Sequence, residues 1–129
     1  MIGLPRGVEV YMYDAPCDMR RSFNTLSALV TGDMRRDLMA GDLYLFVSKN
    51  RRRAKVLYFD GTGLCLFAKR MESEQRFPAP WKMKKKELTL SELSLFIEGA
   101  IASRQTLSPP VLRKADLAIS PASTEALYG

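Results

Sequence analysis

The sequence predicts a single α+β domain, in which an antiparallel sheet of four or five strands contains a β-meander and is flanked by two main helices. Helical periodicity near residues 19–31 and 90–102 predicts the helices. Three apolar runs between residues 43 and 71, separated by turn residues, predict the meander. With 129 residues, 47% of them hydrophobic, the chain is long enough for one core.

The first strand and helix are expected between residues 8 and 32. Residues 8–13 are rich in β-branched and aromatic side chains, which favours a strand. A turn follows, and Asp18 is suited to cap the helix after it. The apolar stripe of that helix consists of Met19, Phe23, Leu26 and Val30. Residues 33–40 fit a further helical turn or a loop equally well.

The predicted meander consists of strands at residues 43–49, 54–60 and 63–71. The Asp60-Gly61 dipeptide between the last two is a strong hairpin signal. Residues 72–87 form a polar, basic connection in which an additional edge strand could lie.

A second helix is expected after this connection. Thr89 and Glu92 have the spacing of a capping box, and Leu88 with Leu93 has that of a hydrophobic staple. The apolar face of this second helix is Leu93, Phe96, Ile97, Ala100 and Ile101. The domain is expected to span residues 1–102, followed by an extended or disordered tail at 103–129 that contains Ser108-Pro109-Pro110.

The residue types argue against catalysis. The chain has no histidine and two cysteines, Cys17 and Cys65. This excludes His-dependent nucleophilic pairs and a Cys-rich zinc site. Each acidic residue has a local structural role that explains it, so we expect no enzyme, no metal site and no cofactor. No apolar run is long enough to span a membrane and no leader opens the chain, so we expect a cytoplasmic protein without a membrane partner.

The positive charge is concentrated in the middle of the chain. The formal net charge is +6, yet residues 49–86 carry 12 basic and 3 acidic side chains. Such a segment attracts a polyanion. The candidate nucleic-acid-binding residues are Arg20, Arg21, Lys49, Arg51, Arg52, Arg53, Lys55, Lys69, Arg70, Arg76, Trp81, Lys82, Lys84, Lys85 and Lys86.

Three of these groups have a structural alternative. The arginines at 51–53 could be a solvated turn, in which case changing all three to serine would leave folding nearly intact. Trp81 could stack on a base or belong to the core. Arg20 and Arg21 could bind an anion at a helix N-terminus or pair with Asp14 or Asp18.

Several blocks of sequence resemble a known family. DMRRSF at 18–23 resembles the DMRKGF opening helix of small accessory proteins of bacterial insertion sequences of the sixty-six family, often called TnpB. GDLYLF at 41–46, KVLYFDGTGLCLFAKRME at 55–72, RF at 76–77 and the helix at 88–99 follow in the family's order. The resemblance covers about residues 4–101, and Cys17 and Ser22 depart from the common threonine and glycine. It does not extend to the RNA-guided nucleases of the same symbol, which are far longer.

The resemblance implies a non-enzymatic accessory factor of DNA transposition, encoded beside a larger transposase. Together with the charge distribution, it leads us to expect DNA binding through the basic surface of residues 49–86. The implied partners are DNA, the transposase and another accessory protein of the same element. The alternative is a protein–protein adaptor whose basic face docks on the transposase or on the sister accessory protein without touching DNA.

Overall fold

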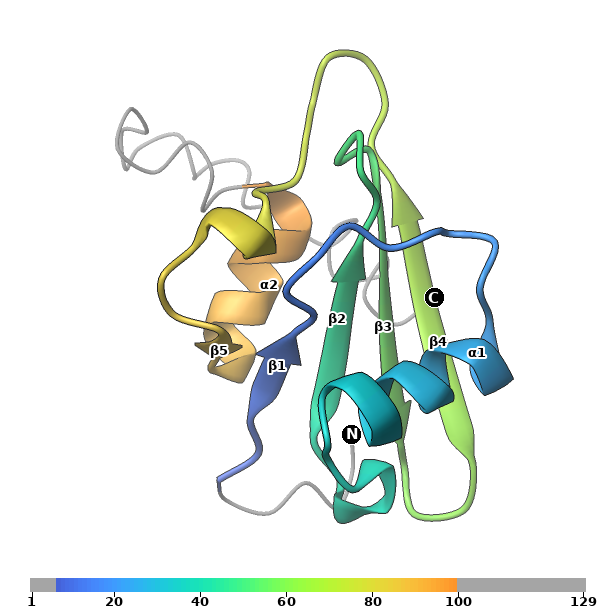
Figure 1. Ribbon diagram of the computed structural model, residues 1–129. Coiled ribbons are helices and arrows are strands. Elements are labelled where there is room, and N and C mark those ends of the chain that lie inside the picture. Colours follow the sequence, from blue (N-terminus) through green and yellow to red (C-terminus); the bar gives the residue numbers. More distant parts are fainter. Residues whose placement is uncertain (1–6, 100–129) are drawn as a thin grey trace.

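A five-stranded sheet with the order β4-β3-β2-β1-β5 organises the chain (Figure 1). The computed structural model describes residues 7–99. The strands are β1 (Val10–Met12), β2 (Leu43–Val47), β3 (Arg53–Phe59), β4 (Leu64–Arg70) and β5 (Glu87–Leu88). The helical segments are α1 (Phe23–Ala28), a π-helical turn (Leu29–Asp33), 3-10 helices at Leu38–Ala40 and Pro80–Lys82, and α2 (Leu90–Glu98). The predicted α+β class, strand number and two flanking helices are confirmed.

The sheet is mixed rather than wholly antiparallel. β2, β3 and β4 form the predicted antiparallel meander, and β5 pairs antiparallel with β1. β1, however, runs parallel to β2, with Val10 opposite Leu43. The reason is the connection, because the chain leaves β1, passes through α1 on one face and returns to β2 in the same direction. An additional edge strand was possible within the basic connection, residues 72–87. The short β5 begins at the last residue of that connection.

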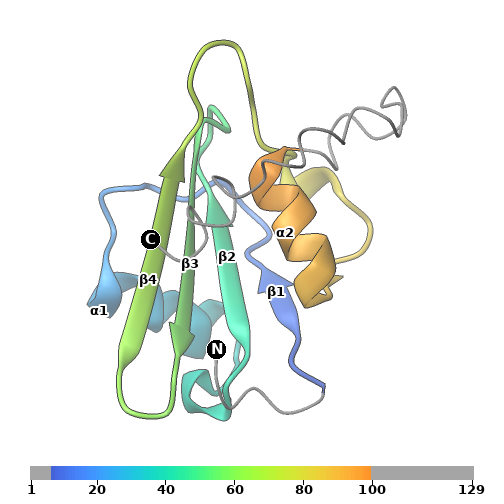
Figure 2. The same ribbon diagram turned by 180° about the vertical axis from the view of Figure 1, so that it is seen from behind.

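The two helices cover opposite faces of the sheet, as Figures 1 and 2 show from the front and from behind. Leu43 and Leu45 of β2 pack in one core cluster with Phe96 of α2. Tyr44 and Phe46 of the same strand pack in a second cluster with Leu26 of α1. All five residues of β2 are buried. A continuous apolar strand is what a sheet covered on both faces requires.

The first helix starts later than predicted. Its N-cap is Ser22, not Asp18, and the backbone N–H of Ser22 donates to the Thr25 hydroxyl. Asp18 instead closes a turn, where its Oδ1 accepts the backbone N–H of Arg20 at 2.9 Å. Aspartate hydrogen-bonds readily to the backbone two residues on, and this turn competes with helix initiation. Of the predicted stripe, Leu26 and Val30 are buried, whereas Phe23 is 42% exposed.

The β3–β4 turn and the start of α2 follow the predictions. Asp60 Oδ1 accepts the backbone N–H groups of Thr62 and Gly63, and these bonds lower the pKa of its carboxyl to about 2. Gly61, between Asp60 and Thr62, has φ +108°, a conformation that favours glycine.

The capping box and the staple of α2 are also present. Thr89 Oγ1 accepts the Glu92 N–H while Glu92 Oε1 accepts the Thr89 N–H, and Leu88 and Leu93 are buried in one cluster. Gly99 caps α2 at φ +85°. The helix was predicted to continue to residue 102, but Ala100, Ile101 and the tail at 103–129 lie outside the described residues.

Candidate nucleic-acid interface

An open groove lies where the segment before α1 meets the β2–β3 hairpin and β4. It consists of two hollows, of about 690 Å³ and 290 Å³, which share Met19 and Arg53 in their linings. We call it the basic groove. Its other lining residues are Cys17, Asp18, Arg20, Ser48, Lys49, Asn50, Ala54, Lys55, Ala68, Lys69 and Arg70. The structure thus brings together six of the fifteen candidate residues, and none of the lining side chains is aromatic.

Two arginines face each other in the groove. Arg53 on β3 lies directly opposite Arg70 on β4 in the antiparallel register. Like charges at opposite positions destabilise a sheet. Arg70 makes a 3.0 Å ion pair with Glu72, in which both side chains are well exposed. Arg53 is exposed and, within residues 7–99, has no carboxylate within ion-pair distance. An anion bound between the two arginines would relieve their repulsion.

Lys55 adds positive charge to the groove while holding its wall in place. Its Nζ donates to the carbonyl oxygens of Met19 and Arg21, at 2.9 and 2.7 Å. These bonds tie the segment before α1 to β3. Since both acceptors are neutral, the charge of Lys55 is not cancelled by them. Lys49, at the tip of the hairpin, is exposed.

For Arg20, the ion-pair alternative is the one that the structure shows. Its Nη2 lies 2.6 Å from Asp18 Oδ2, and its Nε also donates to that carboxylate. The hydrogen bonds from Arg20 hold the pKa of the Asp18 carboxyl well below its usual range. Because the helix begins only at Phe23, neither Arg20 nor Arg21 lies in its first turn. The described structure therefore does not place these two arginines at a helix N-terminus, as the anion-binding alternative required.

Arg51 and Arg52 are structural residues, which corrects the expectation that the whole turn is a solvated or contact surface. Arg51 Nη1 donates to the carbonyl oxygen of Phe77, and Arg52 Nη2 to that of Met71, each at 3.2 Å. In return, the backbone carbonyl oxygens of Arg51 and Arg52 accept the N–H groups of Phe77 and Met71. Both arginine side chains are half-buried. They fasten the connection after β4 to the hairpin, and only Arg53 of the three is exposed.

Three more candidate cations donate hydrogen bonds to backbone carbonyl oxygens. Lys69 borders the groove from the other face of β4, donates to the carbonyl oxygen of Ile97 at the end of α2, and has its pKa lowered by burial. Arg76 donates to the carbonyls of Glu74 and Gln75. Lys86 donates to Pro80 and Met83 and pairs with Asp14 at 2.9 Å. A carbonyl-bound cation is held in place and is a poorer phosphate ligand than a free one.

The remaining candidates lie away from the groove. Trp81 is half-buried and packs against the core beside α2, which is the core alternative for this residue. Lys82, Lys84 and Lys85 are exposed near β5, at the opposite edge of the sheet from β4. The basic residues of 49–86 therefore do not form one continuous stripe.

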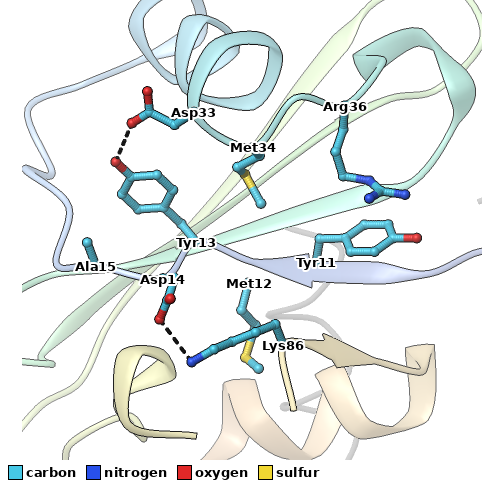
Figure 3. Close-up of a pocket in the computed structure, with 9 residues that line it drawn as sticks. All are labelled: Tyr11, Met12, Tyr13, Asp14, Ala15, Asp33, Met34, Arg36 and Lys86. Carbon is cyan, nitrogen blue, oxygen red and sulfur yellow. Dashed lines mark hydrogen bonds and ion pairs between the residues drawn. The ribbon is translucent and has the colours of Figure 1, made fainter. Parts of the chain in front are cut away.

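A third hollow, of about 350 Å³, lies between β1 and the turn after α1 (Figure 3). Its charged groups are already satisfied. Tyr13 donates its hydroxyl to Asp33 at 2.7 Å, which raises the pKa of the tyrosine, and Lys86 pairs with Asp14. The guanidinium carbon of Arg36 lies 3.6 Å from the centroid of the Tyr11 ring and covers that face. This hollow presents neither a free cation nor an open aromatic face of Tyr11.

The density of positive charge in the sequence does not identify the groove residues that are not basic. Asp18 competes for Arg20 at the groove mouth. Asn50 Oδ1 accepts the Arg52 N–H and the Ser48 hydroxyl, which shapes the hairpin tip. A serine two residues before an asparagine in a turn is the signal that indicates such a local hydrogen bond.

Other chemistry has little support among residues 7–99. Cys17 and Cys65 are both free thiols, and burial raises the pKa of Cys17. In this described range no three Cys, Asp or Glu side chains gather as a metal site would require. The helices in the same range are all too short or too polar to cross a bilayer.

The fold and groove define a class: a small α+β protein with an open, cation-rich groove. The chain belongs to the family of IS66 Orf2-like proteins, whose family model matches residues 8–106. This is a family of accessory proteins associated with transposition, and it is not a family of known enzymes. The resemblance seen in the sequence blocks is thereby confirmed.

Two relatives from Sinorhizobium fredii strain NGR234 are similar to this chain. The uncharacterized protein y4jC is 33% identical over 109 residues, which cover 84% of this chain and 93% of the relative. The uncharacterized protein y4hO is 34% identical over 71 residues, which cover 54% and 62% of the two chains. No solved structure matches the chain.

Proposed function

We propose that this accessory protein binds duplex DNA through the basic groove, with little dependence on base sequence. The observation that carries the proposal is the opposed pair Arg53 and Arg70, beside Lys49 and the un-neutralised Lys55. A protein gains nothing in stability from placing two like charges face to face on exposed positions. Backbone phosphates placed along the groove turn this repulsion into binding energy.

The lining of the groove supports contact with phosphates rather than bases. It contains no aromatic side chain on which an unpaired base could stack. Lysine and arginine contacts to phosphate fix a protein on the duplex without reading sequence. We therefore expect similar affinity for duplexes of unrelated sequence.

Salt dependence tests the proposal. Three side chains, Lys49, Arg53 and Arg70, can reach phosphates from the exposed groove surface, whereas Arg20 is paired with Asp18. Each phosphate neutralised contributes about −0.9 to the slope of log K against log salt, so we expect a slope of about −3 for the full chain. Fluorescence anisotropy of labelled duplexes measures it. A flat salt response, or no binding at low salt, would contradict the proposal and favour the adaptor that docks on the transposase.

Removing the acid at the groove mouth should strengthen binding. Asp18→Asn keeps an oxygen acceptor for the Arg20 N–H but releases the Arg20 guanidinium for phosphate. We expect affinity to rise about three- to tenfold near 0.1 M salt, since one added contact is worth about 0.9 log units there. Asp37→Asn is the matched control, because it removes one charge from an exposed capping aspartate outside the groove. An equal effect of both substitutions would show that only net charge matters.

A further inference from the structure

A second cationic surface is built into the connection between β4 and β5. We call residues 80–86 the lysine loop. Trp81 and Met83 point into the core cluster, while Lys82 and Lys84 between and after them are exposed. Lys85 is also exposed and lies 3.5 Å from Glu92, at the start of α2. Within residues 7–99, Lys82 and Lys84 have no ion-pair partner.

Lys86 fixes the shape of the loop. Its Nζ donates to the carbonyls of Pro80 and Met83, at 2.9 and 2.6 Å, and pairs with Asp14 on the segment after β1. The 3-10 helix at Pro80–Lys82 packs its tryptophan inward. The exposed lysines thus lie on a loop whose backbone is already ordered, so ligand binding carries no entropy cost for ordering that backbone.

The lysine loop and the basic groove lie on opposite faces and at opposite edges of the sheet. Arg53 and Lys55 alternate with Ala54 and Val56, which face α2, so the groove lies on the α1 face. The loop packs through Trp81 against the α2-side core. Both views of the fold show residues 80–86, in yellow, beyond β1 and away from β3 and β4 (Figures 1 and 2). Four strand spacings separate β4 from β5, roughly 19 Å.

From this arrangement we propose that the protein bridges two DNA duplexes, one in the basic groove and one on the lysine loop. The inference rests on the proposed function of the groove. Duplex DNA is stiff over about 50 nm, so one straight duplex cannot follow the protein from one face of the sheet to the other. Two cationic surfaces on opposite faces of the sheet therefore contact two different duplexes.

A capture assay with the full chain tests the bridge. A short biotinylated duplex is fixed on beads, the protein is added, and a fluorescent duplex of unrelated sequence is then captured or washed away. We expect the native chain to retain the second duplex. The K82S/K84S/K85S variant should bind the bead-bound duplex as the native chain does but capture at least tenfold less of the second, since loss of the two unpaired lysines, Lys82 and Lys84, alone removes about 1.8 log units near 0.1 M salt.

The arms of the assay separate the possible failures. Arg35→Ser, which removes an exposed charge outside both surfaces, should leave capture unchanged. Undiminished capture by the K82S/K84S/K85S variant would overturn the bridge and would assign capture to self-association. Loss of first-duplex binding in that variant would also overturn it, because the loop and groove would then share one duplex. Failure of the native chain to bind the first duplex would contradict the proposed function itself, whereas single-duplex binding without capture would contradict only the bridge.

Discussion

The K49S/R53S/R70S protein is expected to fold normally and to bind duplex DNA about 100- to 1,000-fold more weakly than the native chain near 0.1 M salt. Each phosphate contact is worth about 0.9 log units at that salt concentration relative to 1 M, so three contacts are worth about 2.7. Folding should persist because Lys49, Arg53 and Arg70 are exposed and because the change removes an opposed pair of like charges. Anisotropy titrations at several salt concentrations should also show a slope shallower by about 2.7.

A charge-preserving variant is the control for this result. Arg53→Lys with Arg70→Lys keeps both cations, so the salt slope should match that of the native chain within about one phosphate contact. Circular dichroism and urea unfolding would establish that each variant is folded. Native affinity in the K49S/R53S/R70S protein would mean that the groove is not the DNA contact.

The R51S/R52S protein is expected to be less stable than the native chain by about 2–4 kcal/mol. Each arginine donates to a carbonyl oxygen of the connection after β4, and a hydrogen bond from a charged donor contributes about 1.5–3 kcal/mol. The sum for two bonds is reduced by about a third because both side chains are only half-buried and are partly screened by solvent. The free energy of unfolding from urea titration measures the effect.

Arg53→Ser is the matched control on the same hairpin. Arg53 is exposed, and surface changes of this kind usually stay within about 0.5 kcal/mol. A stability difference between R51S/R52S and R53S therefore separates the structural arginines from the groove arginine. Equal stability of the two proteins would show that the Arg51 and Arg52 bonds do not hold the connection in solution.

Local signals in the sequence predicted much of the fold. The capping box at Thr89 and the Asp60-Gly61 turn each depend on residues within four positions, and both are present. The sequence places the start of α1 too early because Asp18 suits a helix cap and a turn equally well. The turn that Asp18 forms is also bonded by Lys55, which lies far away in the sequence and donates to the Met19 and Arg21 carbonyls. The parallel pairing of β1 with β2 requires that the connection through α1 return the chain to the end of the sheet where β1 began, and hydrophobic periodicity does not encode this return.

The candidate site was harder to predict than the fold, and for a physical reason. The sequence shows where cations are dense but not which of them are used by backbone carbonyls. Arg51, Arg52 and Lys69 are taken up in this way. The opposed pair of Arg53 and Arg70 depends on the register of the β3–β4 hairpin, so it could be inferred only after the turn at Asp60 had fixed that register.

Nuclear magnetic resonance mapping of the ¹⁵N-labelled full chain, during titration with a short duplex at low salt, tests most directly whether the basic groove binds DNA. If it does, amide shifts in the groove should concentrate at residues 18–20, 48–55 and 68–70, with a separate set at 82–85 as the duplex is added in excess. Shifts that cluster around residues 33–42, where the acidic Asp33, Asp37 and Asp42 lie, or no shifts at any duplex concentration, would contradict it.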